Sequence, residues 1–195
     1  MDPSDILFTT PTLNDALPST SNVPASEDCY AMHEDDWRQF EFVSSRFSTQ
    51  VAAETVAIDR IWREQSVPVG EYQAFRECHI RKAIPQPLNI PFSSSELETL
   101  FGTETRGITI VGYGSELADV YAVHLDGVIV YAQIAQGKLT ALGLEPTGPF
   151  VLQGDAAARM EQFLSKHDVM LVHWRSRTVF STPAEAMQYL MGKRS

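Results

Sequence analysis

Residues 119–144 contain three runs in which apolar and polar residues alternate: 119–125, 128–134 and 138–144. Asp126-Gly127 connects the first run to the second, and Gln136-Gly137 connects the second to the third. A dipeptide of this kind between alternating runs is typical of a β-hairpin, because glycine adopts the backbone conformations that a tight turn requires. The sequence therefore predicts an antiparallel β-meander, around which the rest of the chain has to pack.

The remaining apolar pattern predicts helices and strands without regular alternation. The clearest helix spans 50–65, where Val51 and Ile58 share an apolar face and Glu54 belongs to the opposite face. Other helices are expected after the capping pattern Ser95 to Glu98, at 155–165 and after Thr182, and other strands at 37–43, 72–84, 108–111, 169–174 and 177–180. This combination predicts the α+β class: a mainly antiparallel sheet with a central β-meander, packed with about three to four helices in a single domain.

The strand expected at 37–43, WRQFEFV, has side chains of two kinds. Phe40 and Phe42 are in phase with each other, and Gln39 and Glu41 fall between them. Because neighbouring residues of a strand point to opposite sides, the two aromatic side chains should face one way and the two polar side chains the other.

The negative charge of the chain is concentrated at its N-terminal end. Residues 1–36 contain eight acidic residues and no Lys or Arg, and the whole chain has a net charge of −10. The remaining residues are almost neutral, with 17 acids against 15 bases. A nearly neutral domain lacks the positive field that attracts nucleic acid, so we expect no nucleic-acid partner.

The first 27 residues differ in composition from the rest. Prolines at positions 3, 11, 18 and 24, with many Ser and Thr residues between them, prevent a long helix. We divide the chain into an acidic, Pro/Ser/Thr-rich N-terminal arm at 1–27, either disordered or packed on the domain, and a single α+β domain at 28–195. Acidic segments with scattered apolar residues often fold onto a partner. The candidate partner-binding residues of the arm are Ile6, Leu7, Phe8, Leu13 and Leu17.

The segment ITIVGYGSELADVYAV at 108–123 begins like a dinucleotide site, with an apolar run followed by Gly112 and Gly114. The fingerprint requires a glycine at relative position 6, where this chain has Leu117. The residues that follow alternate as a strand, which leaves no room for the helix whose N-terminus would hold the phosphates. We therefore interpret the glycines as a bend between strands and expect no cofactor.

Potential metal ligands gather near the end of the acidic region. Cys29, His33, Asp35 and Asp36 lie within eight residues and are the candidate ligands of a metal centre. Their chemistry is mixed, and no second cluster with matching spacing follows. The alternative, which we favour, is an acidic lead-in to the first strand of the domain, with no metal.

Cys78 and His79 are adjacent and suggest a nucleophile and its base. Neighbours on a strand point to opposite faces, so these two residues cannot serve each other directly. Each could pair with a distant residue, or the cysteine could simply pack in the core. The dispersed catalytic site would use Cys78, His79, His124 and His173, with Asp119 or Asp126 as the orienting acid.

The segment HWRSRT at 173–178 places His173, Arg175 and Arg177 in phase, with Trp174 opposite. Alternating bases on a strand line one surface, which could hold a small anion or nucleic acid. Three bases are fewer than a phosphate-backbone footprint usually needs. An equally economical interpretation is that the acidic N-terminal segment lies against this strip.

Composition and targeting signals point to the cytoplasm. No apolar run approaches the roughly 20 residues that cross a bilayer, and the start MDPSDILFTT lacks the pattern of a signal peptide. Two cysteines cannot make a disulfide framework, and free thiols fit a reducing compartment. We therefore expect a cytoplasmic protein with no membrane partner.

No motif in the sequence forms a complete catalytic set. The sequence therefore favours a non-enzymatic protein-binding protein of the inhibitor, immunity or chaperone-like type, which would use the acidic arm or a sheet edge. A protein partner is expected, and a homo-oligomer stays open. The alternative is a small enzyme or ligand-binding domain whose site is assembled from dispersed His, Cys and Asp residues.

Overall fold

The predicted β-meander is the centre of the observed sheet. In the computed structural model, which describes residues 7–15 and 17–193, β10 (Ser115–Leu125), β11 (Val128–Ala135) and β12 (Lys138–Pro146) pair as antiparallel neighbours. Gly127 and Gly137 have φ values of 77° and 72°, the left-handed conformation that glycine adopts without strain. The two turn signals therefore act as the sequence predicts.

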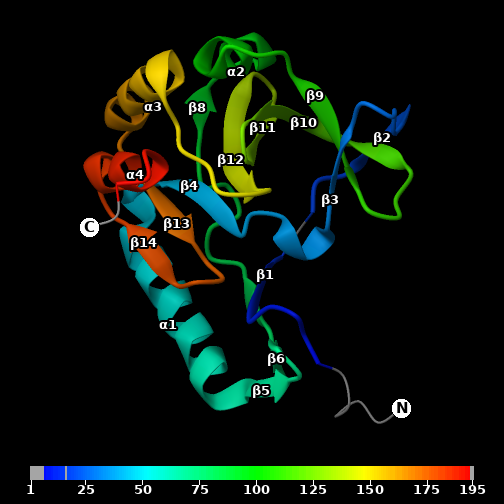
Figure 1. Cartoon of the computed structure of the whole chain (residues 1–195), viewed down its shortest axis with the longest axis vertical. Helices are drawn as coiled ribbons and strands as arrows, with labels where there is room; N and C mark the ends of the chain where they lie inside the picture. Colours follow the sequence, from blue (N-terminus) through cyan, green and yellow to red (C-terminus); the bar gives the residue numbers. More distant parts are fainter. Residues whose placement is uncertain (1–6, 16, 194–195) are drawn as a thin grey trace.

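The sheet extends from the meander in both directions (Figure 1). Its further strands are β2 (Thr20–Pro24), β3 (Tyr30–Met32), β4 (Phe40–Ser44), β8 (Ile90–Pro91), β9 (Arg106–Ile110), β13 (Val169–His173) and β14 (Thr178–Phe180). The order along the main path is β14-β13-β4-β12-β11-β10-β9-β3, with β2 beside β10 and β8 beside β12. Only β3 joins this sheet in parallel, on β9. The predicted α+β class with a mainly antiparallel sheet is confirmed.

Two small pairings hold the N-terminal segment and a projecting hairpin. β1 (Thr12–Asn14) runs parallel to β7 (His79–Arg81), while β5 (Ser66–Val69) and β6 (Tyr72–Phe75) form an antiparallel hairpin. The prediction of one strand over 72–84 is therefore wrong. Its two halves, β6 and β7, pair with different partners, and alternation along the chain cannot show that.

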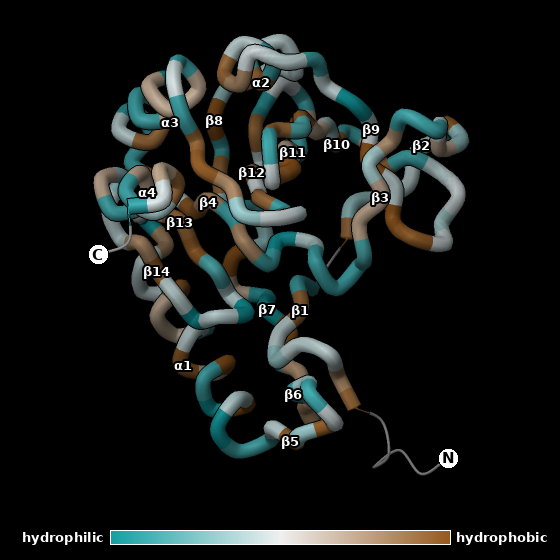
Figure 2. The backbone as a smooth tube through the Cα atoms, in the orientation of Figure 1, coloured by the Kyte–Doolittle hydropathy of each residue, from teal (hydrophilic) through white to brown (hydrophobic). Residues whose placement is uncertain are grey.

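Four helices among the described residues cover the sheet: α1 (Ser48–Gln65), α2 (Ser94–Phe101), α3 (Gly154–His167) and α4 (Pro183–Leu190). Side chains of α2, α3 and α4 pack with one face of the meander, β4 and β13. Val51 and Ile58 of α1 pack with the opposite face of β4 and β13. Figure 2 shows the hydrophobic segments β4 and β13 between these helices. Among the described residues, no helix has the length and apolar character needed to cross a lipid bilayer.

Strand β4 is buried on both faces because helices lie on both sides of it. Phe42 belongs to the core under α2–α4 and Val43 to the core over α1. Gln39 and Glu41, which alternate with the two phenylalanines, are buried as well. Glu54 is also buried, so its assignment to the polar face of α1 was wrong. Buried polar groups need partners, and those partners define the site described below.

Capping residues begin two of the helices. Ser93 and Glu96 form the capping box of α2, two residues before the predicted pair, and Gly102 ends the helix in the left-handed conformation. Thr182 and Glu185 form the capping box of α4, where Pro183 occupies the first turn as predicted. A side-chain oxygen at this position accepts a hydrogen bond from an otherwise unpaired backbone N–H group.

Gly143 of β12 allows Tyr131 of β11 to cross its neighbouring strand. A Cβ atom at position 143 would lie 2.2 Å from the Tyr131 ring, far inside van der Waals contact. The ring therefore lies directly over the glycine and stacks on Trp37, with ring centroids 4.9 Å apart. Both aromatic side chains are fully buried, so neither can move into solvent without opening the core.

We expect Gly143→Ala to destabilise the protein by about 1–3 kcal/mol, because overpacking forces a buried ring out of place. Gly148→Ala is the matched control, since a Cβ there would meet its nearest neighbour only at 4.0 Å. Urea unfolding followed by circular dichroism measures both. Equal stability of the two variants would contradict the close packing of Tyr131 on this glycine.

Candidate functional site

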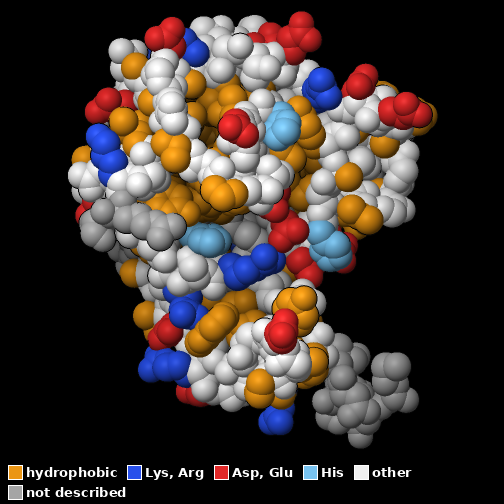
Figure 3. Space-filling model, viewed as in Figure 1, with side chains coloured by type: hydrophobic (Ala, Val, Ile, Leu, Met, Phe, Trp, Pro, Cys, Tyr) orange, Lys and Arg blue, Asp and Glu red, His pale blue; other side chains and the backbone are white. Residues whose placement is uncertain are grey.

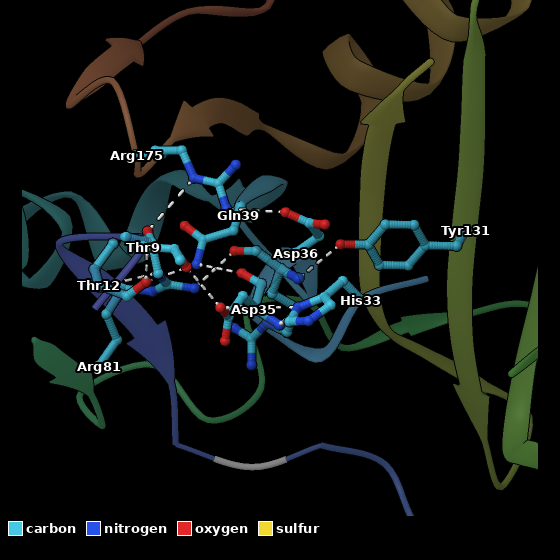
Figure 4. A network of polar contacts seen from close by, with 11 residues as sticks. Thr9, Thr12, His33, Asp35, Asp36, Gln39, Arg81, Tyr131 and Arg175 are labelled. Atoms are coloured by element: carbon cyan, nitrogen blue, oxygen red, sulfur yellow. Dashed lines mark hydrogen bonds and ion pairs between the residues drawn. The ribbon is translucent and has the colours of Figure 1, made fainter. Parts of the chain in front are cut away.

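A buried polar network joins the N-terminal segment to the sheet (Figure 4). We call it the polar joint and define it by Thr12, Arg38, Gln39, Glu41, Arg81, Tyr131 and Trp174, all of which are buried. Its members come from β1, β4, β7 and β11, from the turn before β4 and from the turn after β13. Arg81 and Thr12 lie on one side of the view and Tyr131 on the other.

The ion pair of Arg38 with Glu41 is the centre of the polar joint. Nε of Arg38 donates to Oε2 of Glu41 at 2.6 Å, and a terminal nitrogen donates to Oε1 at 3.3 Å. Trp174 Nε1 donates to the same Oε1 at 2.8 Å. The Arg38 side chain also donates to the carbonyls of Ile84 and Pro85. A buried charge pair is stable only when its remaining donors and lone pairs are satisfied in this way.

The backbone of Arg38 contributes to the polar joint as much as its side chain. Its N–H donates to the Tyr131 hydroxyl at 2.7 Å, and its carbonyl accepts from Arg81 at 2.7 Å. Its φ of 56° lies in the left-handed region, where a residue other than glycine is strained. Such strain persists only where the surroundings fix the conformation, and here three hydrogen-bonding neighbours do so.

Arg81 is bound to neutral groups. Its terminal nitrogens donate to the Thr12 hydroxyl at 3.0 Å and to the Arg38 carbonyl, and its guanidinium lies 4.9 Å from the centre of the Trp174 ring. Burial lowers the pKa of Arg81 to about 10, although Glu41 opposes this effect. Arg81 is therefore a buried cation held by dipoles and an aromatic ring.

The acidic N-terminal segment contacts the basic strip, as one of our two interpretations predicts. Arg175 donates to Asp36 at 2.9 Å and to the Thr10 hydroxyl at 3.4 Å. Arg177 instead pairs with Asp59 of α1 and lies over the ring of Trp62. The three bases do not line one strand face, because β13 ends at His173 and the residues that follow it form a turn.

The four candidate catalytic residues do not converge. Nε2 of His79 bonds to the buried Glu54, His124 lies at the edge of Tyr30, and His173 packs on Phe40. In the part of the chain that the structure describes, none of these histidines contacts Asp119 or Asp126. Burial raises the pKa of the Cys78 thiol to about 11, with a further contribution from Asp35. A thiol of this kind is a poor nucleophile.

The candidate metal ligands also separate. The Cys29 thiol donates to Glu116 at 3.1 Å, while Nδ1 of His33 accepts the backbone N–H of Asp35. Asp36 is the carboxylate that pairs with Arg175. No group of three or more His, Cys, Asp or Glu residues in 7–15 and 17–193 could hold a metal ion together.

Three of the four described apolar candidates of the predicted arm lie against its own domain. Phe8 forms a β-bridge with Phe75, Leu13 lies in β1, and Leu17 packs on the core beneath β9 and β10. Leu7 is exposed, and Ile6 lies outside the described residues. Their contact with a partner stays a prediction.

A projecting acidic region lies at the C-terminal end of the N-terminal segment. Residues 20–36 and 104–119, which we call the acidic lobe, comprise β2, β3, β9, the first part of β10 and the turns between them. The lobe contains eight acidic residues and one base, Arg106. Figure 3 shows acidic and hydrophobic side chains together on this projecting part, while most Lys and Arg side chains lie elsewhere on this face. The lobe is therefore a local region of negative charge.

Gly112 and Gly114 shape the turn at the tip of the acidic lobe. Their φ values are 90° and 69°, and β10 begins directly after them. The bend between strands is thus confirmed, and the segment that follows is a strand where a dinucleotide site requires a helix.

Comparison with known protein families, with curated proteins and with solved structures finds no match to this chain.

The residues of the polar joint escaped the sequence analysis for a physical reason. Arg38, Glu41 and Arg81 are ordinary charged residues near strand ends, and charge at such positions usually faces water. The available signal was Glu41 itself, a carboxylate between two phenylalanines of one strand. Its partners could not be named, because Trp174 is 133 residues away along the chain.

We expect Glu41→Gln to lower the free energy of unfolding by about 3–5 kcal/mol, because it leaves the buried Arg38 cation without a counter-charge. The control is Arg63→Gln, which removes an exposed ion pair with Asp59 on α1 and should cost about 0.3–0.5 kcal/mol. Chemical denaturation of both variants measures the difference. Similar small losses would show that the Arg38–Glu41 pair is not essential to the joint.

A second prediction concerns Glu145 at the end of β12. Burial raises the pKa of Glu145 from 4.5 to about 7, and the nearby Asp36 adds to the shift while Arg175 opposes it. The folded protein therefore holds a proton that the unfolded chain releases, so this group makes stability fall as the pH rises from about 4.5 through about 7. Glu145→Gln should flatten that decline in thermal melts, and Glu161→Gln on the exposed side of α3 should leave it unchanged.

Proposed function

We propose that this protein is non-enzymatic and acts by binding a basic protein partner through the acidic lobe. The observation that carries the proposal is the exposure of three large apolar side chains there: Val23 at 54 %, Val111 at 60 % and Tyr113 at 46 %. They lie among eight carboxylate residues and a single base. Apolar side chains surrounded by charge of one sign are typical of a surface that another protein covers.

The exposed apolar residues are close to one another through the backbone of the lobe. Val111 and Tyr113 lie in the turn between β9 and β10, and Pro24, next to Val23, pairs with Ser115 just after that turn. The Tyr113 hydroxyl donates to Glu34 at 3.3 Å, which restricts the ring before a partner arrives. A restrained tyrosine loses little conformational entropy on binding, and tyrosine is enriched among the residues that dominate interface energies.

Side chains rather than strand addition would make this interface. The Ser21 hydroxyl accepts the backbone N–H of Val23 and donates to its carbonyl, so a side chain already occupies backbone groups of β2. Side-chain bonds of this kind compete with strand pairing. The proposed docking surface is thus the turn and its rim of carboxylates.

The charge of the lobe indicates the chemistry of the partner. Glu27, Asp28, Glu104 and Asp119 are exposed, and none of them has an ion-pair partner within the described residues. A negative surface speeds encounter with a positive one and disfavours acidic competitors. Inhibitors and immunity-type proteins act by binding a partner and neutralising it. We propose that this protein belongs to that class and neutralises a basic protein.

The decisive comparison uses two matched pairs of exposed residues in the full chain. Val111→Ser with Tyr113→Ser removes the apolar centre of the lobe, and Val69→Ser with Tyr72→Ser removes an exposed pair of the same residue types from the β5–β6 hairpin. Each protein is immobilised and used to capture partners from native lysate of its source cells. We expect a basic protein to be retained by the wild type and the hairpin variant and weakened at least about 10-fold with the lobe variant, since central interface residues each contribute about 1–2 kcal/mol or more.

Salt provides an independent check. The captured complex should form more slowly as NaCl rises, because screening shortens the reach of exposed charges. Retention of the same protein by both double variants, or capture of an acidic protein with no salt effect, would count against the acidic lobe as the docking surface.

A further inference from the structure

A cavity of about 270 Å³ opens beside the polar joint, and none of its lining residues belongs to the acidic lobe. Its walls come from the N-terminal segment at Asp15 and Leu17, from the turn after β7 and from the ends of β11 and β12. An irregularity in the pairing of β11 with β12, between Gln133 and Ile134, lies at this wall. The cavity is near the lower end of the size range of small-molecule sites.

Two equally buried arginines line this cavity, and only one of them contacts a carboxylate. Arg38 and Arg81 are each 5 % exposed. Arg38 is neutralised by the bidentate contact with Glu41. Arg81 has no carboxylate within 4.0 Å in the described residues, and only two of its five N–H donors have hydrogen-bond acceptors there. Glu41 and Glu54 act on Arg81 only from a distance. A buried cation with no carboxylate in direct contact is costly, and an anion in the cavity would supply that contact.

The other groups that line the cavity suit an organic anion. Lys82 adds a cation at the wall, partly compensated by Asp15 at 3.5 Å. Gln86 and Gln133 offer amide donors, and Trp37, Leu17 and Pro18 form an apolar wall. The residues that line the cavity thus include three cations, Arg38, Arg81 and Lys82, and one anion, Asp15. This combination of a few polar groups with an apolar wall is the usual composition of a ligand site.

We propose that the cavity binds a small organic anion, with its carboxylate or phosphate on the Arg81 guanidinium and its apolar part against Trp37. Arginine is suited to this role, because its planar donors match both anions in a bidentate contact. The site is separate from the acidic lobe, so it adds a small ligand to a protein-binding protein. Either proposal can fail without affecting the other.

Isothermal titration calorimetry at low salt tests the site with defined probes. Phenyl phosphate and benzoate present the two anions on a ring, inorganic phosphate lacks the ring, and benzamide lacks the charge. We expect one ring-bearing anion to bind more tightly than the other, inorganic phosphate to bind more weakly, and benzamide not to bind. The stronger of the two ring-bearing probes identifies the anion that the site prefers.

Variants locate the binding. Arg81→Met should abolish it, and Ala135→Phe should block it by filling the cavity without changing any charge. The control for bulk is Ala52→Phe on the exposed side of α1. Loss of probe binding in Ala135→Phe but not in Ala52→Phe, with native circular dichroism for both variants, supports the site.

If Arg81→Met does not fold, substitutions of two exposed charged residues, Asp15 and Lys82, still test the site. Asp15→Asn should tighten binding and Lys82→Met should weaken it, each by about 3-fold, because exposed charges act through a well-screened field. Lys166→Met on α3 should change nothing. Absence of binding by every anion at millimolar concentration, or affinities that none of these substitutions alters, would overturn the proposal.

Discussion

A hydrogen bond from the backbone N–H of Arg38 to the Tyr131 hydroxyl links the residue that begins the approach to β4 with the meander, beside the direct pairing of β4 with β12. Tyr131 belongs to β11 of the meander. Arg38 lies before β4, the strand that pairs with β13. The bond forms only because Gly143 leaves space for the ring to pass over β12. Burial raises the pKa of the Tyr131 hydroxyl well above its usual range, so it stays a neutral acceptor for this N–H at all physiological pH values.

The remaining contacts of the polar joint depend on that connection. Once Arg38 is held in its left-handed conformation, its carbonyl meets Arg81 and its side chain meets Glu41. The same arrangement leaves one buried guanidinium neutralised and the other facing a cavity. Stability and the proposed anion site therefore share one residue, because Arg81 binds the backbone carbonyl of Arg38, whose side chain forms the ion pair with Glu41.

Local features of the fold could be predicted from the sequence, and long-range ones could not. The hairpin turns, the α1 periodicity and the proline-started α4 depend on neighbouring residues, so their signals are complete within a few positions. The strand expected at 72–84 divides into two because its first half, β6, pairs with β5 and its second half, β7, pairs with β1. The polar joint could not be predicted from the sequence. Glu41 has the pattern of an outward-facing residue, and only the positions of α1 and Trp174 show why it is buried.

The position of β4 between β12 and β13 has a consequence for the route by which the chain folds. Glu41 pairs with residues 143 and 172, so the strand finds both neighbours only after more than a hundred further residues. Contacts at such separation require closure of long loops and slow the search for the native topology. The meander, whose strands are adjacent in sequence, can assemble first and act as a template. On the ribosome, β4 is synthesised before either of its neighbours, so both of its edges stay unpaired and its apolar side chains on both faces stay exposed until β12 and β13 follow. Segments of this kind are the ones that chaperones shield.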